Sequence, residues 1–230
     1  MTSMATKILY SEEEMALAFQ KKLLSKKGLP GIGPFWRVFK EVLSLSGRPD
    51  FLGIQKKNRK KVQFSNLNGS IVASSIMALL KPNTSKSLKT IVKNTGFSLP
   101  VVKRVLKGLV EDNHIVQAGP DMFKGTEVSL IAEMETFVFE LKLNNTKRAI
   151  FQAQQYKSFA HHVFIIAPPS RIPNYRKFKK VLDLWGIGLA SFDPDTLSFK
   201  IENPSVPKEP ASKQQLLYTV YNAMAQQAAL

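Results

Sequence analysis

Residues 136–143 form the sequence Thr-Phe-Val-Phe-Glu-Leu-Lys-Leu, an alternating strand pattern with two charged residues in an apolar setting. Successive side chains of a strand point to opposite faces, so Val138, Glu140 and Lys142 share one face. The other face carries Phe137, Phe139, Leu141 and Leu143. Burying a glutamate and a lysine is costly unless they have partners or a chemical role. The segment therefore indicates a site built into a buried sheet.

A second acidic residue precedes another apolar run. Gly47-Arg48-Pro49 predicts a turn, and residues 50–54 predict a strand in which Asp50, Leu52 and Ile54 share a face. Two carboxylates suit a hard divalent cation such as Mg²⁺ or Mn²⁺, and a nearby lysine can orient water or stabilise developing charge. Asp50, Glu140 and Lys142 are therefore the candidate catalytic residues, with Asp50 and Glu140 as metal ligands.

The first predicted helix offers a further acid. Ser11 is placed to cap it, three glutamates follow, and Met15, Phe19 and Leu23 form its apolar stripe. Glu12 lies on the same side as Met15, so we expect it to project toward the buried side and to aid the metal. The alternative is that Glu12 only complements the positive end of the helix dipole.

The charge distribution indicates a polyanionic partner. The formal net charge is +16, and positions 51–110 contain twelve Lys or Arg and no Asp or Glu. Such a field favours nucleic acid. The absence of cysteine excludes disulfides and thiolate zinc sites. No apolar run approaches the about 20 residues that span a bilayer, and residues 1–10 lack the apolar core of a signal peptide. We therefore expect a cytoplasmic protein without a membrane partner.

The basic stretch contains the pattern of a winged helix. Helices are predicted over 70–80, 85–94 and 98–112, followed by a hairpin over 114–124, which is the order of that helix-turn-helix variant. The third helix carries Lys103, Arg104 and Lys107, the basic face, which we expect to bind DNA. The alternative is a core-packing helix with solvated lysines. Residues 56–61 predict a solvated loop that also contacts phosphates through Lys56, Lys57 and Arg59.

The remaining segments predict further strands and helices. We expect strands over 35–45, 128–131, 163–167, 187–193 and 197–201, of which 163–167 has the continuous apolar run of a buried parallel strand. Helices are expected over 144–160 and 175–184. Residues 203–212 predict a linker, and 213–230 a helix that either docks on the body or pairs two subunits.

This order of elements resembles the PD-(D/E)xK nuclease superfamily. Pro49-Asp50 and Glu140-Leu141-Lys142 match its defining motif, over roughly residues 11–55 and 127–202. Gln152 and Tyr156 are similar to the Gln-x-x-x-Tyr motif of RecB-type members, whose side chains help orient DNA. The resemblance implies an α/β fold with a restriction-endonuclease-like mixed sheet flanked by helices. A winged helix-turn-helix insertion would explain the distance from Asp50 to Glu140.

The predicted domains follow from this resemblance. They are a first core part (1–60), a winged-helix insertion (61–126), a second core part (127–202) and a linker with a C-terminal helix (203–230). The implied activity is that of a Mg²⁺- or Mn²⁺-dependent endonuclease acting on double-stranded DNA, with a homodimer possible. The alternatives are a non-catalytic DNA-binding protein and, more weakly, an RNA-binding module. A strand over 129–133 could also replace the Asp50 strand, which would put Ser129 in the place of the first acid.

Overall fold

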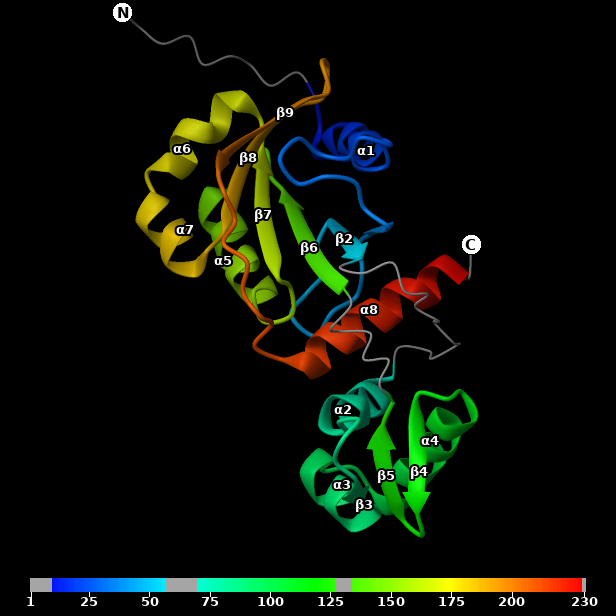
Figure 1. Cartoon of the computed structure of the whole chain (residues 1–230). Helices are drawn as coiled ribbons and strands as arrows, with labels where there is room; N and C mark the ends of the chain where they lie inside the picture. Colours follow the sequence, from blue (N-terminus) through cyan, green and yellow to red (C-terminus); the bar gives the residue numbers. More distant parts are fainter. Residues whose placement is uncertain (1–9, 57–69, 127–133, 229–230) are drawn as a thin grey trace, which may run out of the picture. The chain divides into compact units, whose positions relative to one another are not determined.

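The computed structural model describes residues 10–56, 70–126 and 134–228, and the chain divides into two compact units (Figure 1). Unit 1 comprises residues 1–56 and 135–211, and unit 2 comprises residues 57–134 and 212–230. A six-stranded mixed sheet and a three-stranded sheet are the two sheets of the described residues. The fold is therefore mixed α/β, with segments far apart in the sequence brought together in each unit.

The six-stranded sheet has the order β1-β2-β6-β7-β8-β9. Its strands are β1 (Arg37–Lys40), β2 (Phe51–Lys56), β6 (Met134–Leu141), β7 (His162–Ala167), β8 (Gly188–Asp193) and β9 (Ser198–Asn203). Strands β6, β7 and β8 pair in parallel, whereas β1 pairs with β2, and β8 with β9, in antiparallel fashion. The continuous apolar run of β7 fits a central parallel strand that is covered on both faces.

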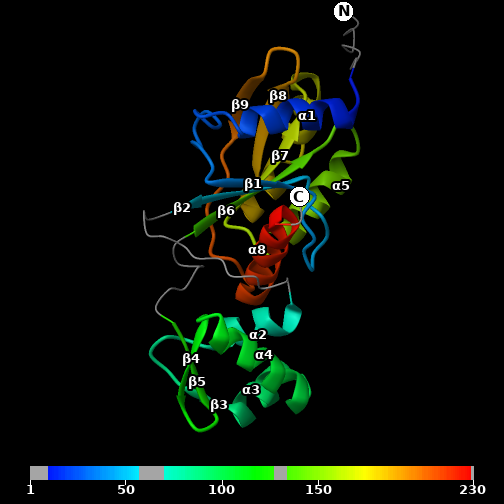
Figure 2. The ribbon, with the colours of Figure 1, turned by 90° about the vertical axis from the view of Figure 1, so that its right-hand side faces the viewer.

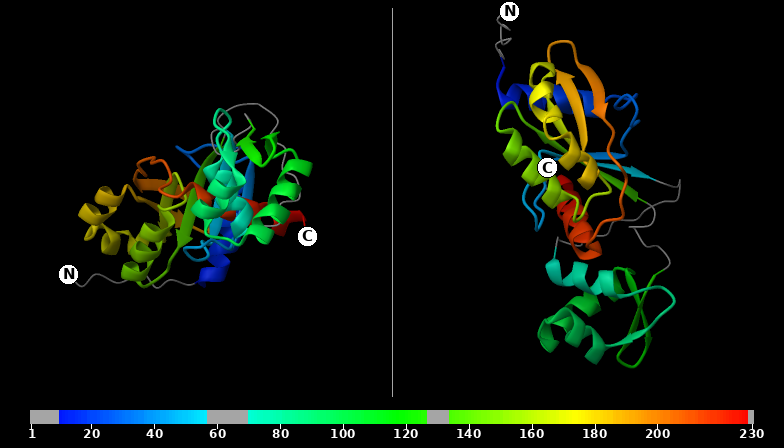
Figure 3. Two further views of the ribbon diagram at one scale, coloured as in Figure 1. Left: turned by 90° about the horizontal axis from the view of Figure 1, so that it is seen from below. Right: turned by 90° about the vertical axis from the view of Figure 1, so that its left-hand side faces the viewer.

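Helices cover both faces of this sheet (Figures 1 and 3). Helix α1 (Glu12–Leu23) lies on one face, and α5 (Thr146–Tyr156), α6 (Ile172–Arg176) and α7 (Lys179–Trp185) lie on the other, with the short 3₁₀ helix η1 (Pro169–Arg171) leading into α6. A capping box starts α1, because Ser11 Oγ accepts the N–H of Glu14 at 3.1 Å while the Glu14 carboxylate accepts the N–H of Ser11 at 2.7 Å.

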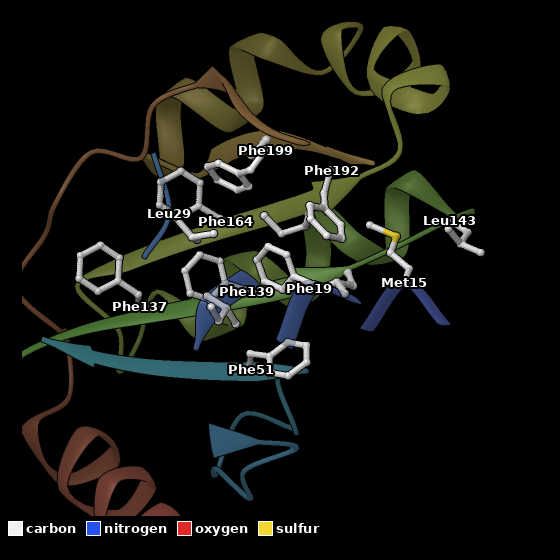
Figure 4. Packing of buried hydrophobic residues seen from close by; sticks show 14 residues of the cluster. Met15, Phe19, Leu29, Phe51, Phe137, Phe139, Leu143, Phe164, Phe192 and Phe199 are labelled. Atoms are coloured by element: carbon white, nitrogen blue, oxygen red, sulfur yellow. The ribbon is translucent and has the colours of Figure 1, made fainter. Parts of the chain in front are cut away.

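The core between α1 and the sheet is rich in phenylalanine (Figure 4). The fully buried Phe19 ring meets Phe51 of β2, Phe139 of β6 and Phe192 of β8 edge-on, with centroid distances of 5.8, 5.5 and 5.1 Å. Edge-to-face contacts at such distances are favourable beyond simple burial. Phe19 therefore fixes α1 across three strands, and the start of α1 is held with them.

Unit 2 has its own core and its own sheet (Figure 2). Its elements are α2 (Ile71–Leu79), β3 (Lys86–Ser87), α3 (Leu88–Thr95), α4 (Leu99–Glu111), β4 (Ile115–Gly119), β5 (Met122–Gly125) and α8 (Lys213–Ala228). The sheet has the order β3-β5-β4 and is antiparallel. Gly96 ends α3 in the left-handed region at φ 72°, which glycine adopts without steric cost, and so permits the turn into α4.

The C-terminal helix α8 belongs to unit 2. It packs on α2, where Gln214 Nε2 donates to Ser75 Oγ at 2.7 Å and the Tyr221 hydroxyl donates to Met77 Sδ at 3.5 Å. Its buried apolar side chains are Leu216, Leu217, Val220, Tyr221 and Ala223. Of the two roles that the sequence left open, the structure has this helix docked on its own chain.

The observed elements depart from the expected ones at several points. The strand expected over 35–45 is only β1, because Glu41 has a φ of 51°, which extended backbone does not adopt. The helix expected over 175–184 is two helices, and the first begins earlier, with Pro173 in its first turn. Strand β6 ends at Leu141, and the short β3 was not expected.

Some of the predicted positions lie outside the described residues. They are Lys57, Arg59, the strand over 128–131 and the alternative residue Ser129. Among the described helices, none combines the length and the apolar character needed to cross a membrane.

Candidate active site

The two predicted carboxylates come from neighbouring strands of the six-stranded sheet. Asp50 directly precedes β2, Glu140 lies near the end of β6, and these two strands are adjacent. The backbone N–H of Leu141 donates to Asp50 Oδ2 at 2.7 Å. This short hydrogen bond joins positions 91 residues apart and holds Asp50 against the Glu-Leu-Lys segment.

Lys142 lies between two acids. Its Nζ is 3.5 Å from Glu140 Oε1 and 3.6 Å from Glu12 Oε2, and its side chain is only 17% exposed. The N–H of Leu143 donates to Glu12 Oε1 at 3.3 Å. Glu12 was expected to point toward the buried side; its side chain is instead half-exposed, and its carboxylate reaches the end of the Glu-Leu-Lys segment from the start of α1.

The electrostatics of this group disfavour two negative charges. Burial and then the charge of Asp50 raise the pKa of Glu140 to about 7, although Lys142 and Tyr156 oppose the shift. Burial also raises the pKa of Asp50, against the N–H of Leu141 and the charge of Lys142. Glu140 Oε2 is buried and has no hydrogen-bond partner among the described residues. An additional positive charge next to these carboxylates would offset their repulsion and use the free oxygen.

Tyr156 contacts both the turn before Asp50 and the strand that carries Glu140. Its side chain is buried, and its hydroxyl interacts with the Glu140 carboxylate and with Gln152, one turn earlier on α5. A Cβ placed on Gly47 would lie 3.6 Å from Tyr156 Cε1, so the ring also contacts the turn that leads to Asp50. Burial, followed by the charges of Glu140 and Asp50, raises the pKa of Tyr156, so its hydroxyl stays protonated and can donate.

Two further residues near this site were not expected from the sequence. The Tyr175 side chain of α6 is buried, and its hydroxyl has no hydrogen-bond partner by geometry among the described residues. Burial raises the pKa of Tyr175 to about 12, and the charges of Glu12 and Glu140 add to the shift, whereas the nearby Thr146 side chain and the charge of Arg171 oppose it. Arg171, one turn earlier, has a buried Nε that finds no hydrogen-bond partner in the described ranges of the chain. Arg171 and Tyr175 are four residues apart in the segment that follows Pro168-Pro169, and this spacing could have indicated that they share one face of a helix.

The basic face of α4 lies in unit 2. Lys103, Arg104 and Lys107 are exposed on it, while Val102, Leu106 and Leu109 are buried on the opposite side. Lys107 Nζ lies 3.8 Å from Glu111, an exposed pair one helical turn apart. Lys56, at the end of β2 in unit 1, places its Nζ 4.0 Å from the centroid of the Trp36 ring, so it is not part of an isolated basic loop.

The donor set sets limits on a metal site. Among residues 10–56, 70–126 and 134–228, no group of three or more His, Asp or Glu is arranged to hold an ion. Mg²⁺ commonly uses one or two protein carboxylates and takes its other ligands from water and substrate phosphates. Asp50 and the free oxygen of Glu140 fit a cation of that kind, and they do not form a complete protein cage.

The comparisons with known proteins do not add to this description. The sequence matches none of the family models and none of the curated proteins with which it was compared. The geometry of the site is therefore the basis for a functional assignment.

Proposed function

We propose that this chain is a metal-dependent DNA endonuclease. Its catalytic site in unit 1 hydrolyses phosphodiester bonds of DNA, and unit 2 binds the double-stranded DNA. One observation carries the proposal. The chain joins Asp50 to the Glu140-Leu141-Lys142 segment by a 2.7 Å hydrogen bond and sets Lys142 at 3.5 Å from Glu140. Two partly repelling carboxylates with an adjacent ammonium group support hydrolysis of a phosphodiester assisted by a hard cation.

Each residue has a role in this proposal. Asp50 and Glu140 would hold Mg²⁺ or Mn²⁺, with Glu12 at the rim, and the ion would polarise the phosphodiester and lower the pKa of a bound water. Lys142 orients the attacking water and stabilises the negative charge that develops on the phosphate. Tyr156 holds the Glu140 carboxylate in place, and Gln152 supports Tyr156. The sequence had suggested that Gln152 and Tyr156 orient DNA directly. The burial of Tyr156 favours instead a role in holding the Glu140 carboxylate.

We further propose that unit 2 is a winged helix that binds the duplex. The three helices, the Gly96 turn and the β4–β5 hairpin support this assignment, as does the exposed basic face of α4. Helices of this kind enter the major groove, and lysine and arginine neutralise phosphates there. Lys56 would add a phosphate contact from unit 1.

A cleavage assay tests the catalytic assignment. Supercoiled plasmid and circular single-stranded DNA are incubated with wild type, Asp50→Asn, Glu140→Gln and Lys142→Ala in Mg²⁺, Mn²⁺ or EDTA. We expect wild type to cleave only with a divalent ion and each variant to lose at least about 100-fold, as for removal of one charge-stabilising group. Glu202→Gln, which removes an acid on β9, is the matched control and retains activity.

A binding measurement separates the two parts of the proposal. Each catalytic variant should bind duplex DNA within a few-fold of wild type, because most phosphate contacts come from unit 2. Wild type that binds DNA but cleaves neither substrate with either ion would reject the nuclease and favour the non-catalytic DNA-binding alternative.

A further inference from the structure

Arg171 and Tyr175 each carry a buried polar atom that makes no hydrogen bond to the described residues. Arg171 precedes α6 and Tyr175 lies one turn later, so both side chains extend from the same side of this short helix. The Tyr175 side chain is 1% exposed. Arg171 Nε and the Tyr175 hydroxyl are both buried and lack hydrogen-bond partners by geometry among the described residues. A buried polar group without a partner costs about 1 to 3 kcal/mol, so two such groups one helical turn apart require an explanation.

The surroundings of this pair identify the missing partner. The Tyr175 hydroxyl feels the charges of Glu12, Glu140 and Arg171, and the Thr146 side chain also lies close to it, although no hydrogen bond between the two meets the geometric criteria. Within the part of the chain that the structure describes, Arg171 makes no ion pair with any acid. The two groups offer N–H and O–H donors, and a guanidinium donates best to a carboxylate or phosphate that accepts two parallel hydrogen bonds. The donors therefore lack an anion with acceptor oxygens.

We propose that Arg171 and Tyr175 bind a phosphate of the DNA strand next to the Glu140 site and position that strand for cleavage. This inference rests on the proposed nuclease function and assigns two of its substrate-binding residues. A guanidinium can donate two parallel hydrogen bonds to a phosphate, and a protonated tyrosine adds a neutral donor. The positive charge of the Arg171 guanidinium also offsets the repulsion between a phosphate and the three acids Glu12, Asp50 and Glu140.

The test measures binding of a fluorescein-labelled 20-base-pair duplex by anisotropy, over a series of KCl concentrations with Ca²⁺ in place of Mg²⁺. We expect Arg171→Ala to weaken binding about 10- to 100-fold, as for loss of a hydrogen-bonded charge. It should lower the slope of log K against log salt by about 0.9, the value for one phosphate. We expect Tyr175→Phe to weaken binding about 10-fold and to leave the slope unchanged, because it removes no charge.

Two variants serve as matched controls. Arg176→Ala makes the same charge change at the end of α6, where the guanidinium already donates to Glu202 at 2.9 Å, and it should keep the wild-type slope. Tyr10→Phe removes a partly buried hydroxyl elsewhere in unit 1 and should bind as wild type. Equal slopes for Arg171→Ala and Arg176→Ala, or unchanged affinity for Tyr175→Phe, would overturn the proposal.

A stability measurement excludes a purely structural role. Because the Tyr175 hydroxyl makes no geometrically formed hydrogen bond to Thr146 or to another described residue, Tyr175→Phe should leave the unfolding midpoint unchanged or raise it. A clear drop in the midpoint together with weaker binding would assign the hydroxyl to the fold and reject the proposal.

Cleavage by wild type is scored separately, so the two failures are distinguishable. Wild type that cleaves while Arg171→Ala binds with the wild-type slope keeps the nuclease and rejects the phosphate pair. Wild type that does not cleave while Arg171→Ala loses one phosphate contact rejects the nuclease and keeps an anion-binding pair.

Discussion

Replacing Glu140 with glutamine should stabilise unit 1 when no metal is present. Glu140 is buried, and its pKa is raised from the ordinary 4.5 to about 7 in the folded protein. A pKa difference of about 2.5 corresponds to about 3 kcal/mol, at 1.36 kcal/mol for each unit. Above pH 7 the folded chain bears this cost, because the charged carboxylate is disfavoured by burial and by Asp50. Glutamine keeps the shape of the side chain without the charge.

The sign of the pH dependence follows from linkage. A group whose pKa is higher in the folded state favours folding most below its unfolded pKa, and the benefit is lost as pH rises through the folded value. Wild-type unit 1 should therefore lose stability between about pH 4.5 and 7 through Glu140. The advantage of Glu140→Gln should fall from about 3 kcal/mol at pH 8 to less than about 1 kcal/mol at pH 5.

The assay uses the two tryptophans of the chain, Trp36 and Trp185, both of which lie in unit 1. Urea unfolding followed by their fluorescence in EDTA, at pH 5 and pH 8, gives the free energy of unfolding for this unit. Adding Mg²⁺ at pH 8 should stabilise wild type and not Glu140→Gln, because a ligand that binds only the folded state adds to its stability.

A control of opposite sign is available on β9. Burial tends to raise the pKa of Glu202, but hydrogen bonds from Arg176, Lys200 and Ser191 hold it below its usual value. Glu202→Gln should therefore lower the stability of unit 1 at pH 8. If Glu140→Gln is no more stable than wild type at pH 8, or if its advantage is the same at pH 5, the electrostatic account of the site is wrong.

Three other outcomes follow from the structure. Replacing the basic face of α4 by alanine should weaken duplex binding strongly and lower the log–log salt slope by up to about 2.7, at 0.9 for each phosphate; an unchanged slope would give α4 another role. Gly188→Ala should destabilise unit 1 by about 1 to 3 kcal/mol in urea, since its Cβ would lie 2.3 Å from the Phe164 ring, and wild-type stability would contradict that packing. Burial and the charge of Lys208 lower the pKa of Lys157 to about 8, so unit 1 should gain stability as the pH rises from about 8 to 10. Lys157→Met should remove this gain, and a gain that persists in the variant would mean that another group causes it.

Local patterns in the sequence predicted most of the elements near the site. The alternation around Glu140 placed two charges in a buried strand, and the apolar run after Asp50 placed that acid at the start of another. Ser70 caps α2 by accepting the N–H of Ala73, as a serine before the first turn commonly does. Ser98 precedes α4 as expected but makes no side-chain capping bond, and α3 begins after Ser87 rather than at the expected residue 85. These are effects over a few residues, so they are visible in the sequence.

Contacts between distant segments could not be predicted in this way. The hydrogen bond from Leu141 to Asp50 and the packing of α8 on α2 depend on how the chain returns over large distances. Arg171 and Tyr175 were overlooked because the helix was expected to begin at residue 175, which left Arg171 outside it, and only the tertiary fold buries their polar atoms. The end of β1 was missed because a positive φ at Glu41 has no local sequence requirement.

The separation of Asp50 from Glu140 has a consequence for synthesis of the chain. A ribosome adds about 5 to 20 residues each second, so Glu140 emerges about 5 to 20 seconds after Asp50. During this interval the whole basic stretch from 51 to 110 is made, but β6, which neighbours β2 on the side away from β1, is not. A partial chain released before residue 135 therefore contains the complete positively charged segment and only one of the two carboxylates.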